Sequence, residues 1–302
     1  MRAQLVPTVS KMNESRVVRT ALSAMTFNVR YDEPADGSQA WPHRRELVIA
    51  TIRSHDPDLI GLQEPTASQF EEIAAGLAEY TAFGLFTDEW SGVEPHGGFF
   101  RTERFELRAS GLFWLSETPE IAHSVSWDND WGPRACGWVR LRDRLTDREL
   151  VFASTHVDTN AGSWLPSAQA LQRELAAGAD ERTADDPAIV LVGDFNCPAG
   201  SDAHRYLLSD GRYRDAWLEA GRADDGEVTY HGFTGATRLT DRAAYPPDAF
   251  AFHNYRIDWI LVRGGLTSTA ADIDVRREDD VMPSDHYPVM AVLEWERVRP
   301  DR

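Results

Sequence analysis

Cysteine is scarce in this sequence of 302 residues, which contains only Cys136 and Cys197. Two cysteines do not supply the disulfide framework of a small secreted protein, and a reducing, cytoplasmic location fits them best. The chain therefore depends on a packed core, for which its length and its hydrophobic fraction of 42% provide enough material.

Long apolar runs are also missing. No segment approaches the roughly 20 apolar residues that a membrane-spanning helix needs, and residues 1–20 contain no run of signal-peptide length. We expect these first twenty residues to form a flexible tail. Repeats, low-complexity segments and internal linkers are absent as well, so residues 21–298 are predicted to form a single domain that acts as a monomer.

Basic residues are outnumbered, with 31 Lys and Arg against 49 Asp and Glu, and the net charge is −18. Binding to a nucleic-acid backbone usually relies on a basic surface, so this composition works against it. A smaller anionic substrate remains compatible with the charge, because bound divalent cations would reverse its local sign.

What the sequence does contain is an alternation of strand-like and helix-like segments, in which strands dominate. Apolar residues at 70, 73, 74 and 77 recur at helical spacing, whereas 188–192 is a continuous apolar run typical of a strand covered on both faces. The predicted helices lie at 41–55, 66–77 and 165–181. The predicted strands lie at 21–29, 58–64, 80–86, 97–101, 106–115, 136–142, 149–158, 188–196, 256–262 and 288–296.

Five predicted strands end in, or begin with, polar residues that core packing does not explain. These residues are Asn28, Glu64, His156 with Asp158, Asp194 with Asn196, and Asp258. Residues two apart in an extended chain share a face, so Asp194 and Asn196 point the same way. A buried carboxylate or amide is costly unless it is hydrogen-bonded or bound to a cation.

Taken singly, these residues have simpler interpretations. A lone Asn28 after a strand is typical of a turn, and His156 is compatible with a hydrogen-bonded core histidine. Asp258 could pair with a neighbouring cation, and Asp285-His286, in V-M-P-S-D-H-Y-P-V, is compatible with turn chemistry. The same coincidence at five strand ends is hard to assign to turns, however, and favours a shared site.

Six motifs carry a specific resemblance. M-T-F-N-V-R, G-L-Q-E, S-T-H-V-D, V-G-D-F-N, R-I-D-W-I-L-V and S-D-H-Y-P-V, in this order, resemble the motif series of the endonuclease/exonuclease/phosphatase superfamily over residues 22–296. W-P-H-R-R near residue 41 and the segment 99–120 resemble its small bacterial hydrolase branch. The resemblance implies an α/β fold: a four-layer sandwich of two mixed β-sheets packed face to face, with helices on the outer faces.

The resemblance also implies a metal site. Glu64 would be the principal ligand, Asn28 would support it, and Asp285 would complete or flank the site. Carboxylate and amide oxygens suit a hard cation, so Mg²⁺ is expected, with Mn²⁺ or Ca²⁺ as alternatives.

The catalytic roles follow from the same resemblance. Asp194 would orient and partly deprotonate the attacking water, while Asn196 holds that water or a phosphoryl oxygen. His286 would contact the phosphoryl group, with Asp258 fixing its tautomer, and His156 would donate to the scissile phosphate.

Four further residues are candidates for contact with the substrate: Arg30, Arg134, Asp158 and His231. A guanidinium suits bidentate contact with phosphate, although a surface salt bridge is the alternative for Arg134. Arg30 occupies a position where abasic-site nucleases carry an acid, which separates this chain from that branch.

Two enzymatic functions compete. The first is an Mg²⁺-dependent phosphatase or phosphodiesterase acting on a small phosphorylated metabolite, favoured by the acidic charge. The alternative is an endo- or exonuclease on DNA or RNA, which needs a basic track such as Arg101, Arg104, Arg108 and Arg134 beside the site. A sphingomyelinase-like role lacks an evident aromatic hairpin, and a non-catalytic scaffold would have lost residues that are all present here.

Overall fold

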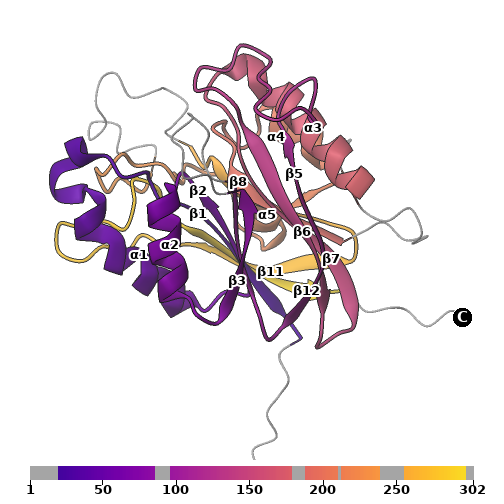
Figure 1. Ribbon diagram of the computed structural model, residues 1–302, viewed down its shortest axis with the longest axis horizontal. Coiled ribbons are helices and arrows are strands. Elements are labelled where there is room, and N and C mark those ends of the chain that lie inside the picture. Colours follow the sequence, from indigo (N-terminus) through magenta and orange to yellow (C-terminus); the bar gives the residue numbers. More distant parts are fainter. Residues whose placement is uncertain (1–19, 86–95, 179–187, 210–211, 239–254, 297–302) are drawn as a thin grey trace, which may run out of the picture.

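Two six-stranded mixed β-sheets packed face to face form the centre of the molecule in the computed structural model, which describes residues 20–85, 96–178, 188–209, 212–238 and 255–296 (Figure 1). Helices cover both outer faces, so the predicted four-layer α/β sandwich is confirmed. Most of the predicted tail, residues 1–19, lies outside the described residues. Within the described part, no helix is long and apolar enough to cross a membrane.

The first sheet has the strand order β11-β12-β1-β2-β4-β3, in which only β1 and β2 run parallel to each other. Its strands are β1 (Leu22–Asn28), β2 (Leu59–Gln63), β3 (Tyr80–Leu85), β4 (His96–Arg101), β11 (Leu266–Ile273) and β12 (Val289–Trp295).

The second sheet has the order β5-β6-β7-β8-β10-β9, and only β7 and β8 are parallel in it. Its strands are β5 (Phe105–Trp114), β6 (Ala135–Asp143), β7 (Arg148–His156), β8 (Ala188–Asp194), β9 (Arg214–Asp215) and β10 (Asp258–Arg263). The two sheets thus have the same strand arrangement, a parallel pair flanked by antiparallel strands.

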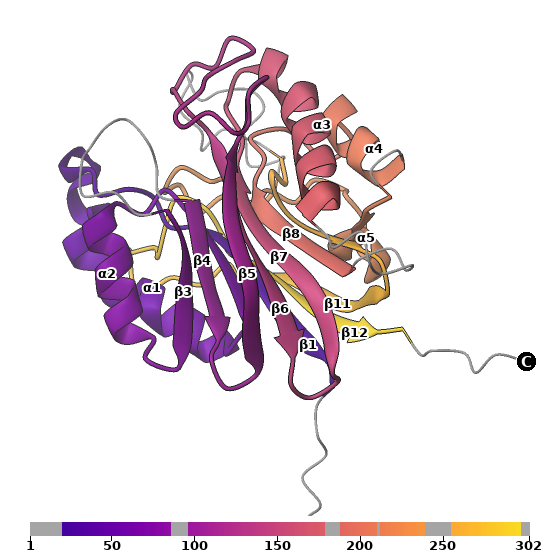
Figure 2. The same cartoon turned by 45° about the vertical axis from the view of Figure 1, so that its right-hand side comes forward.

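The longer helices divide between the two outer faces, α1 and α2 against the first sheet and α3 and α4 against the second (Figure 2). Thr66 begins α2 with a reciprocal capping box to Gln69, which satisfies free backbone donors at the helix start. The helices are α1 (Trp41–His55), α2 (Ala67–Gly76), α3 (Ala161–Gly178), α4 (Asp202–Ser209), α5 (Ala216–Glu219) and the 3₁₀ helix η1 (Pro34–Gln39).

Three hydrophobic clusters correspond to the three interfaces between the four layers. One joins the inner faces of the sheets, and the others lie beneath α1 and α2 and beneath α3 and α4. The sheets lie close together at Gly61, where an added Cβ would lie 2.3 Å from Cγ2 of Val192 on the facing sheet. Glycine is therefore required in the centre of β2, because any side chain there would push the sheets apart.

The strand directions bring many chain segments to one edge of the sandwich. β1, β2, β7 and β8 all end there, and the antiparallel strands β10 and β12 begin there. The strand ends and loops at this edge carry every polar strand-end residue singled out in the sequence.

Candidate active site

Strand register places three of the predicted residues in one row across the second sheet. Asp194 at the end of β8 lies opposite His156 of β7 on one side and opposite Asp258 of β10 on the other. Side chains directly opposite each other in a sheet point to the same face, with Cβ atoms roughly 5 Å apart. All three are buried, so the row forms a polar patch within an otherwise apolar layer.

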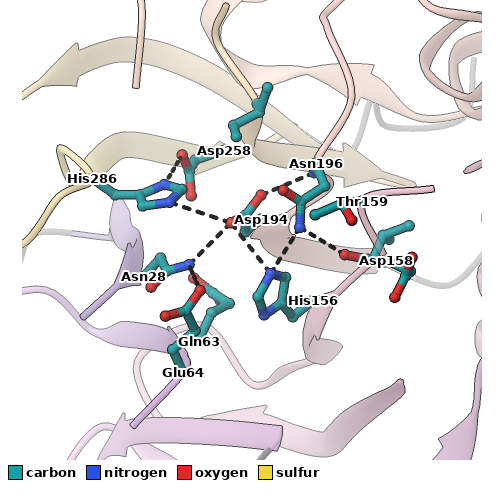
Figure 3. A network of polar contacts seen from close by, with 12 residues as sticks. Asn28, Gln63, Glu64, His156, Asp158, Thr159, Asp194, Asn196, Asp258 and His286 are labelled. Carbon is teal, nitrogen blue, oxygen red and sulfur yellow. Dashed lines mark hydrogen bonds and ion pairs between the residues drawn. The ribbon is translucent and has the colours of Figure 1, made fainter. Parts of the chain in front are cut away.

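Asp194 is the centre of the polar network in Figure 3. Its Oδ2 accepts a hydrogen bond of 3.0 Å from Nδ2 of Asn28 on the first sheet, so the network joins the two sheets. The same oxygen lies 3.4 Å from Nε2 of His156 and 3.6 Å from Nε2 of His286. The other oxygen, Oδ1, accepts a 2.9 Å bond from the backbone N–H of Asn196.

Asn28 also connects Asp194 with Glu64. Its Nδ2 donates to Oε1 of Glu64 at 3.0 Å, and the backbone N–H of Tyr31 donates to Oε2 at 3.3 Å. Glu64 has a left-handed backbone with φ of 66°, uncommon for a residue other than glycine, directly after the last residue of β2. Unlike Asn28 and Asp194, the Glu64 side chain is only partly buried, so it faces the entrance of the site.

The loop before β12 brings in Asp285 and His286. Ser284 donates from Oγ to the backbone carbonyl of Asn28 at 2.7 Å, which ties this loop to the end of β1, and the same oxygen lies 3.2 Å from Oδ1 of Asp285. His286 pairs through Nδ1 with Oδ2 of Asp258 at 2.9 Å.

The ionisation of His286 and Asp194 is set by burial and by their mutual proximity. Burial alone would lower the pKa of His286, but the carboxylates of Asp258 and Asp194 outweigh it and raise that pKa to about 10. Burial and the charge of Asp258 raise the pKa of Asp194 to about 6, against the opposing effect of His286 and His156. Near neutral pH the site therefore pairs an imidazolium with a carboxylate that is a useful base.

Two groups of side chains have the composition of a cation site, Glu64 with His156 and Asp194, and Asp194 with Asp258 and His286. In the second group a protonated His286 has no lone pair to give, so only its two carboxylates could bind a cation. The first lies beside Asp285, whose pKa is raised by burial and by the charge of Glu64, against the effect of His286.

The chemistry of this donor set fits a divalent cation. The carboxylates of Glu64, Asp194, Asp258 and Asp285 lie in or beside one network. In the described part of the chain, the buried Oδ1 of Asp258 has no hydrogen-bond partner. Such an excess of buried oxygen ligands is unfavourable without a cation, and Glu64 with Asn28 and Asp285 stays the predicted set of ligands.

Arg134 and Asp158 lie on the far side of His156. Both are buried, and NH1 of Arg134 donates to Nδ1 of His156 at 2.9 Å. The Asp158 carboxylate accepts backbone hydrogen bonds from Asp130, Trp131 and Asn160, and it lies 3.7 Å from Nε of Arg134. Arg134 and Asp158, both predicted to contact substrate, thus bind other groups of the protein. Their contact with substrate stays a prediction.

His231 and Arg30 lie near the loop that carries Asp285. The backbone N–H of His231 donates to the Asp285 carbonyl at 2.8 Å, and its ring stacks on Tyr287 at 4.0 Å between centroids. Burial and the nearby His286 lower the pKa of His231 to about 3, so this ring is neutral. Arg30 pairs with Asp36, and its side chain remains 22% exposed, so it can reach a ligand at the entrance.

Arg44 is a supporting residue that the sequence analysis did not single out. Its buried guanidinium donates to the carbonyls of Val29 and, at 2.6 Å, Arg30, and to that of Pro283 at 3.2 Å. It thus joins the loop after β1 to the loop before β12. The signal was present in W-P-H-R-R, whose last two residues are Arg44 and Arg45, but only the fold shows that one of them points inward.

Thr229 was also missed, and its hydroxyl accepts the backbone N–H groups of Ile257 and Asp258 at 3.0 and 3.1 Å. These bonds hold the start of β10, where Asp258 must face His286. No local sequence pattern marks a threonine for this role, because its partners are 28 and 29 residues away.

Comparison with known proteins identifies the family and supports the fold. The model of the Endonuclease/Exonuclease/phosphatase family matches residues 25–286. A solved endonuclease/exonuclease/phosphatase from Bacteroides vulgatus is 29% identical, covers 92% of this chain and 100% of its own, and superposes with a TM-score of 0.78. A mannosyl-6-phosphatase from Bacteroides thetaiotaomicron shares the fold at 23% identity and a TM-score of 0.76, over 91% of this chain and 100% of its own.

A curated relative, the CCR4-Not complex 3'-5'-exoribonuclease subunit Ccr4 of Emericella nidulans, is 20% identical over 79% of this chain. This chain spans only 44% of the length of that relative. The family match covers most of the chain, and the bacterial neighbours agree with the branch predicted from the motifs. The chain therefore belongs to the endonuclease/exonuclease/phosphatase family, whose members are metal-dependent hydrolases of phosphate ester bonds.

Proposed function

We propose that this chain is an Mg²⁺-dependent phosphatase or phosphodiesterase that acts by in-line attack of water on a small phosphorylated metabolite. The observation that carries the proposal is the position of Asp194, whose Oδ2 lies 3.0 Å from Asn28 and 3.6 Å from the His286 ring. A base with a raised pKa beside an imidazolium provides both a proton acceptor for water and a positive group for a phosphoryl oxygen.

In this mechanism each residue has one task. Asp194 orients the water and removes its proton. The Asn196 amide, which donates to the Val157 carbonyl at 2.8 Å, lies beside the position of that water. His286 neutralises charge on the phosphoryl group, and Asp258 keeps its ring oriented at 2.9 Å. Glu64, Asn28 and Asp285 would hold Mg²⁺, which supplies charge neutralisation at the phosphoryl and leaving oxygens.

The placement of basic residues supports a small substrate. Arg101 and Arg104 lie near the amino end of β2, at the opposite edge of the sandwich from Glu64, because Leu59 pairs with Phe100. Arg104 is engaged by Asp58 at 2.8 Å and by Asp143 at 3.1 Å. Arginines committed to ion pairs at the far edge do not form a track for a nucleic-acid backbone beside the site.

A nuclease remains the competing function, since the fungal relative is named a 3'-5'-exoribonuclease subunit. The test is a phosphate-release screen over phosphosugars, nucleotides and lipid headgroups, run beside plasmid and RNA cleavage, each with Mg²⁺ and with EDTA. We expect metabolite turnover that EDTA abolishes and Mg²⁺ restores, without strand cleavage. Cleavage of RNA or DNA without metabolite turnover would instead support the nuclease. The cytoplasmic location and the monomeric state remain predictions.

The pKa values predict a bell-shaped pH profile for kcat/KM. The rate should rise with pH through about 6 as Asp194 loses its proton, and it should fall through about 10 as His286 loses its own. The measurement is kcat/KM over both limbs at saturating Mg²⁺. An acid limb centred near the ordinary aspartate value, about 3.9, would contradict the assignment of Asp194 as the base.

A further inference from the structure

His156 has an unusual partner for a histidine in a catalytic site. Its Nδ1 lies 2.9 Å from NH1 of Arg134, and the side chains of both residues are 4% exposed. Histidines that act on substrates more often donate from Nδ1 to a carboxylate or a carbonyl. A guanidinium carries five donors and no acceptor and stays protonated, so Nδ1 of His156 must accept. The proton of the neutral ring is then on Nε2.

Two side chains lie near the other ring nitrogen of His156. Nε2 lies 2.9 Å from Nδ2 of Asn196 and 3.4 Å from Oδ2 of Asp194. A neutral imidazole accepts at only one nitrogen, so Arg134 and Asn196 cannot both donate to it. Asn196 has another acceptor in the Val157 carbonyl at 2.8 Å, whereas the bond from Arg134 is charge-assisted and therefore the stronger one. The balance favours a ring with its proton on Nε2, directed towards Asp194.

Arg134 is itself held in position by an acidic side chain. Asp158 lies 3.7 Å from its Nε and accepts the backbone N–H groups of Asp130 and Trp131, both at 3.1 Å. One carboxylate therefore balances the buried guanidinium and also shapes the loop that carries it. The ion pair with Asp158 explains why Arg134 points at His156 and not at solvent.

We propose that Arg134 is a positioning residue that holds His156 in one orientation, with Nδ1 accepting from the guanidinium and Nε2–H directed into the site. The catalytic consequence rests on the proposed function: His156 donates a hydrogen bond to a phosphoryl oxygen, while His286 provides the charge. The two histidines beside Asp194 then have different tasks because their Nδ1 atoms face opposite partners, a guanidinium for His156 and a carboxylate for His286.

The first test measures the tautomer directly in the wild-type protein. Long-range ¹H–¹⁵N NMR of ¹⁵N-histidine-labelled full-length chain, with His156 assigned by the signal lost in His156→Gln, should show a proton on Nε2 and none on Nδ1. A proton on Nδ1, or a ring protonated on both nitrogens at neutral pH, would overturn the proposal. This measurement needs no substrate, so it is decisive even if the proposed reaction is wrong.

The second test is kinetic, with p-nitrophenyl phosphate and bis(p-nitrophenyl) phosphate as probes in Mg²⁺. Arg134→Met should lower kcat by about 10- to 100-fold, the usual cost of losing a group that orients a functional histidine, with little change in KM. Arg134→Lys, which keeps a charged donor, should recover part of kcat, and Arg142→Met on the exposed face of β6 is the matched control. A large rise in KM with unchanged kcat would instead assign Arg134 to substrate binding and overturn the proposal.

Discussion

Asp194→Asn should lower kcat by about 10²- to 10⁴-fold, the range expected when a general base is removed. Asparagine keeps the size of the side chain and can still accept the 2.9 Å bond from the Asn196 backbone, but it cannot take a proton from water. Turnover of a substrate identified in the screen, at saturating Mg²⁺, measures the effect. Near-wild-type kcat would remove Asp194 from the mechanism.

The same variant should lose less stability at neutral pH than His286→Gln, because two effects oppose each other. Burial raises the pKa of Asp194 to about 6, so the stability that this group contributes is present at low pH and is lost as pH rises through that value. Asparagine avoids the cost of that buried charge, but its amide nitrogen replaces Oδ2 and then faces the donors of Asn28, His156 and His286. Thermal unfolding of Asp194→Asn beside Asp147→Asn, at an exposed position between β6 and β7, therefore separates lost catalysis from lost folding.

His286→Gln should also lower kcat by about 10²- to 10⁴-fold, because the positive group that faces the phosphoryl oxygens is gone. It should be destabilised more than the Asp194 variant, by about 3–5 kcal/mol, since Asp194 and Asp258 are left as buried carboxylates without their shared partner. In the wild type this contribution is fully present below the unfolded pKa of 6.5 and is lost as pH rises through about 10. Chemical denaturation at neutral pH and in the alkaline range measures it.

A double variant separates the two effects of His286. His286→Gln with Asp258→Asn removes the unpaired carboxylate as well, so part of the stability should return while kcat stays low. His43→Gln, on the exposed side of α1, is the matched control and should change neither quantity. Recovery of kcat in the double variant would mean that His286 serves only to neutralise Asp258.

The strand-end pattern was the most informative feature of the sequence. The parity rule for extended chains predicted Asp194 and Asn196 on one face, but β8 ends at Asp194 and Asn196 has a left-handed backbone with φ of 50°, so the rule does not hold there. Asn196 joins the network through its backbone N–H and its side-chain amide instead. Helix α1 was predicted at 41–55 and lies at Trp41–His55, because its start and its apolar spacing are local properties. The four-layer arrangement came from the resemblance of the motifs, and the two mixed sheets confirm it.

Other elements had no usable local signal. β11 (L-T-S-T-A-A-D-I) and the eight-residue α4 were not predicted. β11 is an edge strand that pairs only with β12, so several of its side chains are exposed and its sequence lacks the apolar run of an inner strand. Its pairing, not its composition, defines it.

By itself, the sequence determined which chemical groups are present and at which strand ends they stand, because strand periodicity and chain order are local properties. Only the tertiary structure decided which of these groups contact one another. It directed Arg134 to His156, Arg44 to the carbonyls of Val29 and Pro283, and Asn28 to Asp194 across 166 residues of chain. The physical reason is that sheet register and packing between layers determine the hydrogen-bond partners. Both depend on residues that are distant from one another in the sequence.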